Sequence, residues 1–140
     1  MNSFFGNLDV SLSAMRAERR RMDAVMSNIA HASTTRTPDG GPYRRKEVVF
    51  SEMLDAQGGN AEHGLGVQVT EMVQSQDPFV RVHQPGHPDA DADGYVLYPN
   101  VKPAEEMVDL MASSRSYEAN VTAFRIAREM FQRSLEMGRA

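Results

Sequence analysis

Helix-breaking residues are distributed very unevenly along this chain of 140 residues. All seven prolines and eight of the ten glycines lie between Pro38 and Pro103. The stretches Asn7–Thr37 and Ala104–Met137 contain neither Gly nor Pro, the two residues that most disfavour helix interiors. At 1.5 Å per residue, each stretch can form a helix of about 45–50 Å. The sequence therefore predicts two long helices flanking a middle segment that is rich in turns.

Apolar residues in both end segments recur at alternating steps of three and four, the spacing of a coiled-coil seam. Arg19 interrupts the first seam, and Ser114 and Arg128 interrupt the second. Such a seam is narrower than the apolar stripe of a helix in a globular core, so these helices are expected to pack against other helices. We therefore expect an assembly interface formed by Leu8, Leu12, Met15, Met22, Met26, Ile29, Met107, Leu110, Tyr117, Val121, Phe124, Phe131 and Leu135.

Short runs rich in β-branched or aromatic residues occur in the middle segment, separated by Gly and Pro clusters. They predict four strands, at Glu47–Phe50, Val67–Thr70, Phe79–Val82 and Tyr95–Tyr98. The linkers Pro38–Pro42 and Gln57–Gly66 are expected to be turns or mobile loops. The expected fold class is α+β, with long N- and C-terminal helices forming a coiled coil and a small β-rich middle domain. The expected boundaries are 1–37 for the first helix, 38–102 for the β-rich domain and 103–140 for the second helix.

Sequence signatures of catalysis are absent from this chain. There is no cysteine, no nucleophile elbow, no phosphate-binding loop and no dinucleotide-binding glycine motif. We therefore expect no enzyme activity, no cofactor and no small-molecule substrate. The N-terminus also lacks the pattern of a Sec signal peptide, and no apolar run is long enough to span a membrane.

A basic cluster lies in the middle of the first predicted helix. It contains Arg16, Arg19, Arg20 and Arg21. Glu18 and Asp23 interleave with these cations, and the whole chain carries a net charge of -4. This pattern favours a solvated or inter-subunit charged face, so no nucleic-acid partner is expected. A coiled-coil nucleic-acid binder is the alternative that this cluster leaves open.

The segment PDADADGY, from Pro88 to Tyr95, places three carboxylates at alternate positions before a glycine. The carboxylates belong to Asp89, Asp91 and Asp93, and their spacing matches the start of an EF-hand calcium loop. The twelfth loop position is Asn100 rather than Glu, and nearby prolines preclude an entering helix. An Asp-rich turn is therefore predicted, without a metal site. A calcium-binding regulatory module remains the alternative function.

Four short motifs follow one another along the chain: SNIAHAST at Ser27–Thr34, PDGGPYRRK at Pro38–Lys46, GYVLYPNV at the end of Pro85–Val101, and SRSYEANV at Ser114–Val121. In this order they resemble the family of flagellar rod and hook proteins, in particular its short proximal-rod subunits. The family-motif residues are Ser27, Asn28, Ser114, Arg115, Ser116, Tyr117, Glu118, Ala119 and Asn120. His31 departs from the family pattern, which usually has Asn at this position.

This resemblance implies a structural subunit of the bacterial flagellar basal-body rod that assembles helically and transmits torque across the periplasm. It implies coiled-coil packing of the terminal helices in the inner wall, with the β-rich domain outside. The implied partners are copies of the chain, other rod proteins, and basal-body adaptor or export-gate proteins. Export from the cytoplasm would use the flagellar type III apparatus, without a cleaved signal peptide.

Overall fold

The computed structural model describes residues 2–53 and 66–138. Within these ranges, the elements in order are α1 (Asn2–Ala30), β1 (Lys46–Glu52), β2 (Val67–Gln74), β3 (Val80–His83), β4 (Tyr95–Tyr98) and α2 (Pro103–Met137). The two helices and the two small antiparallel sheets give a mixed α+β fold, as the sequence predicted.

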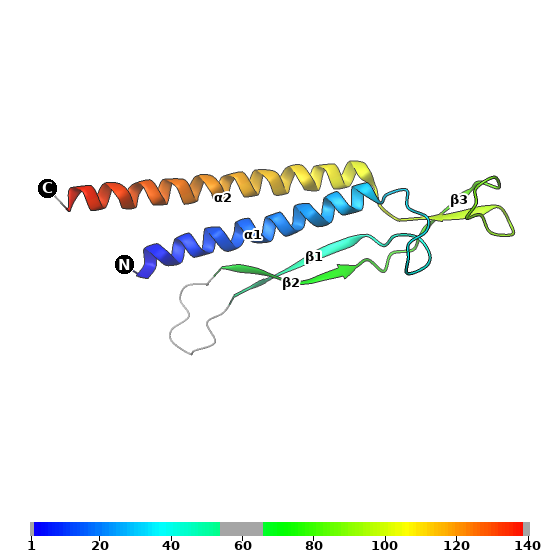
Figure 1. The fold of residues 1–140 in the computed structure, drawn as a ribbon, viewed down its shortest axis with the longest axis horizontal. Helices are drawn as coiled ribbons and strands as arrows, with labels where there is room; N and C mark the ends of the chain where they lie inside the picture. Colours follow the sequence, from blue (N-terminus) through cyan, green and yellow to red (C-terminus); the bar gives the residue numbers. More distant parts are fainter. Residues whose placement is uncertain (1, 54–65, 139–140) are drawn as a thin grey trace.

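The two helices lie side by side along the long axis and run in opposite directions, so both termini lie at one end of the molecule (Figure 1). Pro103 stands in the first turn of α2, where its missing N–H costs nothing, and Gly138 follows its last residue. α1 ends at Ala30, before the predicted Thr37. Beyond α1, the N–H of Tyr43 donates to the carbonyl of Thr34 at 3.1 Å, which holds this segment in a non-helical conformation.

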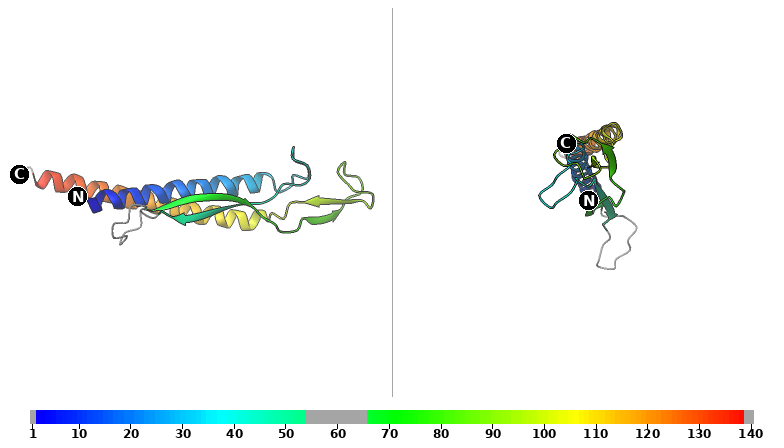
Figure 2. Two further views of the ribbon diagram at one scale, coloured as in Figure 1. Left: turned by 90° about the horizontal axis from the view of Figure 1, so that it is seen from below. Right: turned by 90° about the vertical axis from the view of Figure 1, so that its right-hand side faces the viewer.

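The hairpin β1–β2 packs along α1, which lies between this hairpin and α2 (Figure 2). The strands pair from Lys46–Gln74 to Glu52–Val67, with a shift of register between Val49 and Phe50. At the start of β2, Gly66 has a φ of +117°, and a Cβ there would lie 2.2 Å from Ser13 Oγ. Glycine is therefore needed where the hairpin meets the helix.

β3 and β4 form a second hairpin, paired from Val80–Tyr98 to His83–Tyr95, that extends beyond the helices at the end opposite the termini (Figure 1). The described residues of the middle segment thus form two separate hairpins rather than one sheet. Between β2 and β3 the chain passes through Ser75–Phe79, where Pro78 has no N–H to extend the ladder.

The described core is small and contains several short side chains. Its buried apolar residues are Ala17, Ala24, Val25, Tyr43, Val96 and Val101. Its buried polar residues are Ser13, Asn28, Glu106 and Ser113. Neither described helix is sufficiently long and apolar to cross a lipid bilayer.

Candidate assembly interface

The predicted seam of α2 mostly faces α1 within the same chain. Among the described elements, α2 packs only against α1, so its half-buried positions mark the face toward α1. Leu110, Tyr117, Val121, Phe124 and Phe131 are all half-buried. Two other predicted members are exposed. Met107 is exposed because the buried face of α2 passes through its neighbour Glu106. Leu135 is exposed because it lies in the last turns of α2, where every described residue is exposed.

The predicted seam of α1 is partly buried within the subunit. Its half-buried members are Leu8, Leu12, Met15, Met22 and Ile29, whereas Met26 is exposed. The most buried residues of α1 are instead Ser13, Ala17, Ala24, Val25 and Asn28. The periodic signal of this buried face is in the sequence, because Ser13, Ala17, Ala24 and Asn28 follow one another at heptad-like steps. Their small side chains are not hydrophobic enough for the sequence pattern to have predicted a packed face.

Polar contacts show that this small-residue face of α1 packs against the hairpin. Ser13 Oγ accepts a hydrogen bond of 3.0 Å from the N–H of Val67 and donates one of 2.7 Å to the carbonyl of Val10. α1 thus uses one stripe for the hairpin and another for α2. The sequence analysis assigned one seam to each helix and therefore did not predict the contact between α1 and the hairpin.

α2 carries a second apolar stripe that has no neighbour among the described residues. We call this the outer stripe; it consists of Val108, Ala112, Ala119, Ile126, Met130 and Met137, all exposed. Their steps of four and seven place them on one face, roughly opposite the face that contacts α1. Val108, Met130 and Met137 are 65%, 63% and 74% exposed. Sequence reasoning missed this stripe because the seam on the opposite face contains the bulkier aromatic residues.

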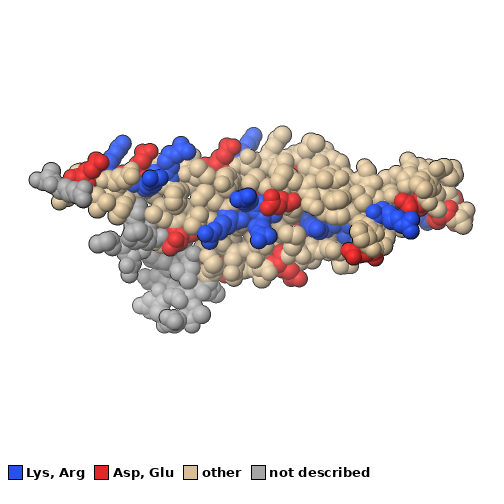
Figure 3. Space-filling view, viewed as in Figure 1, with Lys and Arg blue, Asp and Glu red and all other residues tan. Residues whose placement is uncertain are grey.

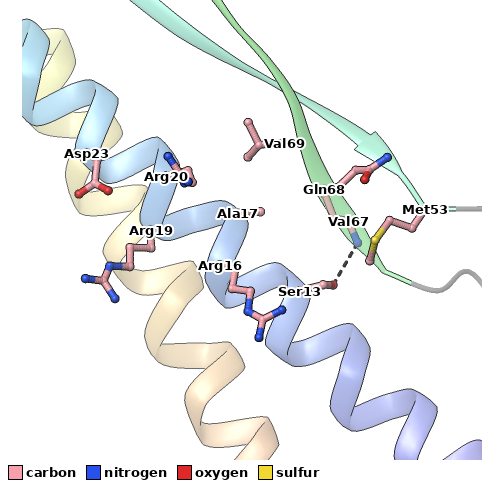
Figure 4. Close-up of a pocket in the computed structure, with 10 residues that line it drawn as sticks. All are labelled: Ser13, Arg16, Ala17, Arg19, Arg20, Asp23, Met53, Val67, Gln68 and Val69. Carbon is pink, nitrogen blue, oxygen red and sulfur yellow. Dashed lines mark hydrogen bonds between the residues drawn. The ribbon is translucent and has the colours of Figure 1, made fainter.

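The basic cluster of α1 lies beside a groove. Basic side chains gather over the middle of the face shown in Figure 3. Figure 4 shows Arg16, Arg19 and Arg20 on the helix side of the groove, opposite Val67 and Val69 of β2. The groove has a volume of about 570 Å³. None of these arginines forms an ion pair with a described residue, which leaves the groove cationic.

A buried polar cluster joins the end of α1, the start of β1 and the start of α2. We call it the junction cluster; it consists of Asn28, Tyr43, Arg45, Lys46 and Glu106. Asn28 Nδ2 donates to the carbonyl of Lys46 at 2.9 Å and to Glu106 Oε2 at 3.0 Å. Asn28 Oδ1 accepts from the N–H of Lys46 at 2.8 Å and from Tyr43 Oη at 3.0 Å. All four hydrogen-bonding positions of this amide are therefore satisfied.

The charge of Glu106 is compensated by Arg45, whose Nε donates to Glu106 Oε1 at 2.5 Å. Burial lowers the pKa of Arg45, but the hydrogen bond and charge of Glu106, with Glu47 and Asp109, raise it more, so the pKa lies above its ordinary value. The cluster therefore contains a permanently charged, paired guanidinium. Of the family-motif residues, Asn28 belongs to this cluster, and Ser27 Oγ lies 3.2 Å from Tyr43 Oη.

The remaining motif residues lie together on α2. They run from Ser114 to Asn120; Ser114 and Tyr117 are half-buried toward α1, and Asn120 Nδ2 donates to the carbonyl of Ser116 at 2.8 Å.

The aspartate turn between β3 and β4 does not gather its carboxylates around one point. Asp91 Oδ1 accepts from the backbone N–H groups of Asp93 at 3.0 Å and Tyr95 at 2.8 Å. Asp89 Oδ2 accepts from Thr35 Oγ1 at 2.8 Å, on a different segment. Over the described ranges, no three His, Asp or Glu side chains are arranged to hold a metal ion. The calcium alternative thus finds no support: Asp91 stabilises the turn itself, and Asp89 binds a different segment.

The C-terminal part of the chain, residues 92–137, matches the family model described as flagellar basal body rod FlgEFG protein C-terminal. These residues contain β4 and all of α2, so the element that carries the outer stripe is of the flagellar rod-protein class.

Full-length relatives define the family more closely. The chain is 45% identical to the flagellar basal-body rod protein FlgC of Bacillus subtilis, over 96% of this chain and 98% of the relative. It is 42% identical to FlgC of Salmonella typhimurium, over 93% and 94% of the two chains. It is 37% identical to FlgC of Borreliella burgdorferi, over 94% and 95%. The chain belongs to the FlgC family of flagellar basal-body rod proteins.

Proposed function

We propose that this protein is a structural subunit of the bacterial flagellar basal-body rod and that it assembles helically through its two long helices. FlgC relatives of nearly equal length are named as rod proteins, which supports a structural and non-enzymatic role. The finer part of the proposal, the assembly surface, rests on the outer stripe of α2.

The outer stripe supports assembly because its apolar residues are exposed, recur along α2 and are unpartnered within the described part of the chain. Large apolar side chains gathered on one exposed face are typical of protein interaction sites. The outer stripe lies on α2 and the cationic groove lies beside α1, so they are two different surfaces of the subunit. A contact between two different surfaces of identical subunits is heterologous, and such contacts generate helical assemblies when they do not close into a ring.

Coiled-coil packing of α1 and α2 is part of this proposal. It is supported by the antiparallel arrangement of the helices and by the alternating steps of three and four between the half-buried residues of α2. The same proposal divides the chain at 1–37, 38–102 and 103–140, with helices toward the rod axis and the β-rich segment outside. The projection of β3–β4 away from the helices supports this division.

We further propose that the subunit is exported from the cytoplasm without a cleaved signal and joins the periplasm-spanning rod. There it contacts copies of itself, other rod proteins and basal-body adaptor or export-gate proteins, and passes torque along the rod. The family membership supports this location.

Substitution within the outer stripe tests the assembly surface. Ile126→Asp is expected to abolish motility and to leave no rods in isolated basal bodies, because it places a charge at an apolar contact. The helix content of the purified variant should stay unchanged, since Ile126 is exposed and faces away from α1. Gln132→Asp is the matched control, with the same charge change at an exposed polar position outside the stripe. Normal rods in the Ile126→Asp strain would refute this surface.

A further inference from the structure

The contact between α1 and α2 does not by itself select one longitudinal stagger of the helices. Its half-buried residues repeat with the heptad, as at Met15 and Met22 on α1 and at Tyr117 and Phe124 on α2. Sliding one helix by seven residues brings apolar positions opposite apolar positions again. Methionine side chains are flexible enough to adapt to different neighbours. Several staggers are therefore close in packing energy.

The junction cluster, in contrast, is complete in only one stagger. Asn28 and Glu106 are each 1% exposed and lie 78 positions apart in the sequence, yet they share a hydrogen bond. A slip of one heptad would place Ser113, or a residue before α2 begins, opposite Asn28. Ser113 has a single hydroxyl and cannot replace a carboxylate that also pairs with Arg45. A slipped stagger would leave buried polar groups without partners, which is strongly unfavourable.

We propose that the junction cluster sets the stagger of α1 and α2, and that Asn28 and Glu106 are positioning residues for the helix pair. A buried polar residue fixes the register of coiled coils in the same way, by penalising every alternative pairing. Asn28 also holds both backbone groups of Lys46, so the first residue of β1 is tied to the same reference point. The cluster thereby aligns three elements at once: α1, α2 and the hairpin.

The distance between two spin labels on the helices measures the stagger directly. Because the chain has no cysteine, single cysteines at the exposed positions Arg19 and Glu129 can be labelled without background. These positions lie far apart along the helix axes, so a slip of one heptad changes their separation by roughly 10 Å. The labelled parent protein should give one narrow distance distribution in double electron–electron resonance.

Glu106→Gln is the decisive variant, because it keeps the shape of the side chain but turns an acceptor oxygen into a donor group. We expect a second distance population, displaced by roughly 10 Å, at unchanged helix content. The matched control is Glu105→Gln, one residue earlier, where the exposed carboxylate pairs with Lys102. This control should keep the single parental distance. A single parental distance in Glu106→Gln as well would overturn the proposal.

Replacing the junction cluster with apolar side chains separates its effect on the stagger from its effect on stability. The triple variant Asn28→Leu, Arg45→Met, Glu106→Leu removes the buried charges and amide together, which often preserves folding while losing specificity. We expect it to retain helical circular dichroism and to show several distances. One parental distance in this folded variant would also count against the proposal. If this variant loses its helical signal, the result for Glu106→Gln decides.

Discussion

The described helix contact is built from small and polar side chains as much as from large apolar ones. Ser113 of α2 is 1% exposed, and its hydroxyl has no hydrogen-bond partner among the described residues. A buried hydroxyl without a partner costs free energy, so Ser113 is held there for its size rather than for its polarity. A small side chain at this position allows the backbones of α1 and α2 to approach each other closely.

Ser113→Ala is therefore expected to stabilise the monomer. The free energy of unfolding in urea should rise by about 1–2 kcal/mol, from removal of the unpaired hydroxyl and from higher helix propensity. Ser116→Ala, at an exposed position of the same helix, should give only the propensity gain of about 0.5 kcal/mol. Equal effects at the two positions would show that burial of Ser113 contributes nothing.

At the scale of elements, the sequence predicted those features that depend on hydrophobic periodicity and on the placement of Gly and Pro. Both helices and the four strands followed from these signals, although β2 extends to Gln74, beyond the predicted end at Thr70. The turn at Pro38–Pro42 also followed from them, whereas the loop predicted at Gln57–Gly66 lies mostly outside the described residues. The partition of the strands into two hairpins did not follow, because strand propensity carries no pairing information. Nor did the junction cluster: Asn28 and Glu106 are polar, and only the fold brings them together.

The connection between α1 and the hairpin gives a prediction at this scale. Gly66→Ala should lower the free energy of unfolding by more than about 1 kcal/mol, because the residue has a positive φ and its Cβ would meet Ser13 Oγ. Gly86→Ala is the control, since no atom lies within 4 Å of its added Cβ. It should change stability by less than about 0.5 kcal/mol. Similar urea midpoints for both variants would contradict the close contact.

The whole molecule is elongated (Figure 1). Its buried residues are concentrated toward one end of the helix pair. Asn28, Tyr43, Val101 and Glu106 are all buried around the junction, whereas every described residue of the last turns of α2 is exposed. Helical segments without tertiary contacts are marginal in water. Order in the free subunit should therefore decrease from the junction toward the termini.

Hydrogen exchange on the purified subunit measures this gradient. Amides of residues 103–117 should exchange at least about tenfold more slowly than those of residues 128–137, because local opening follows local contact density. In isolated rods the slower exchange should extend to the end of α2. Equal protection along α2 in the free subunit would contradict an assembly-linked ordering of its end.

Because both termini lie at one end of the molecule, the two ends of each subunit differ from one another. One tip presents the end of α2, with Leu135 and Met137 exposed, and the other presents the aspartate turn. In the proposed helical stack all subunits would point the same way, so the two ends of the growing structure would present different parts of the chain. The direction of growth would then follow from the asymmetry of a single subunit.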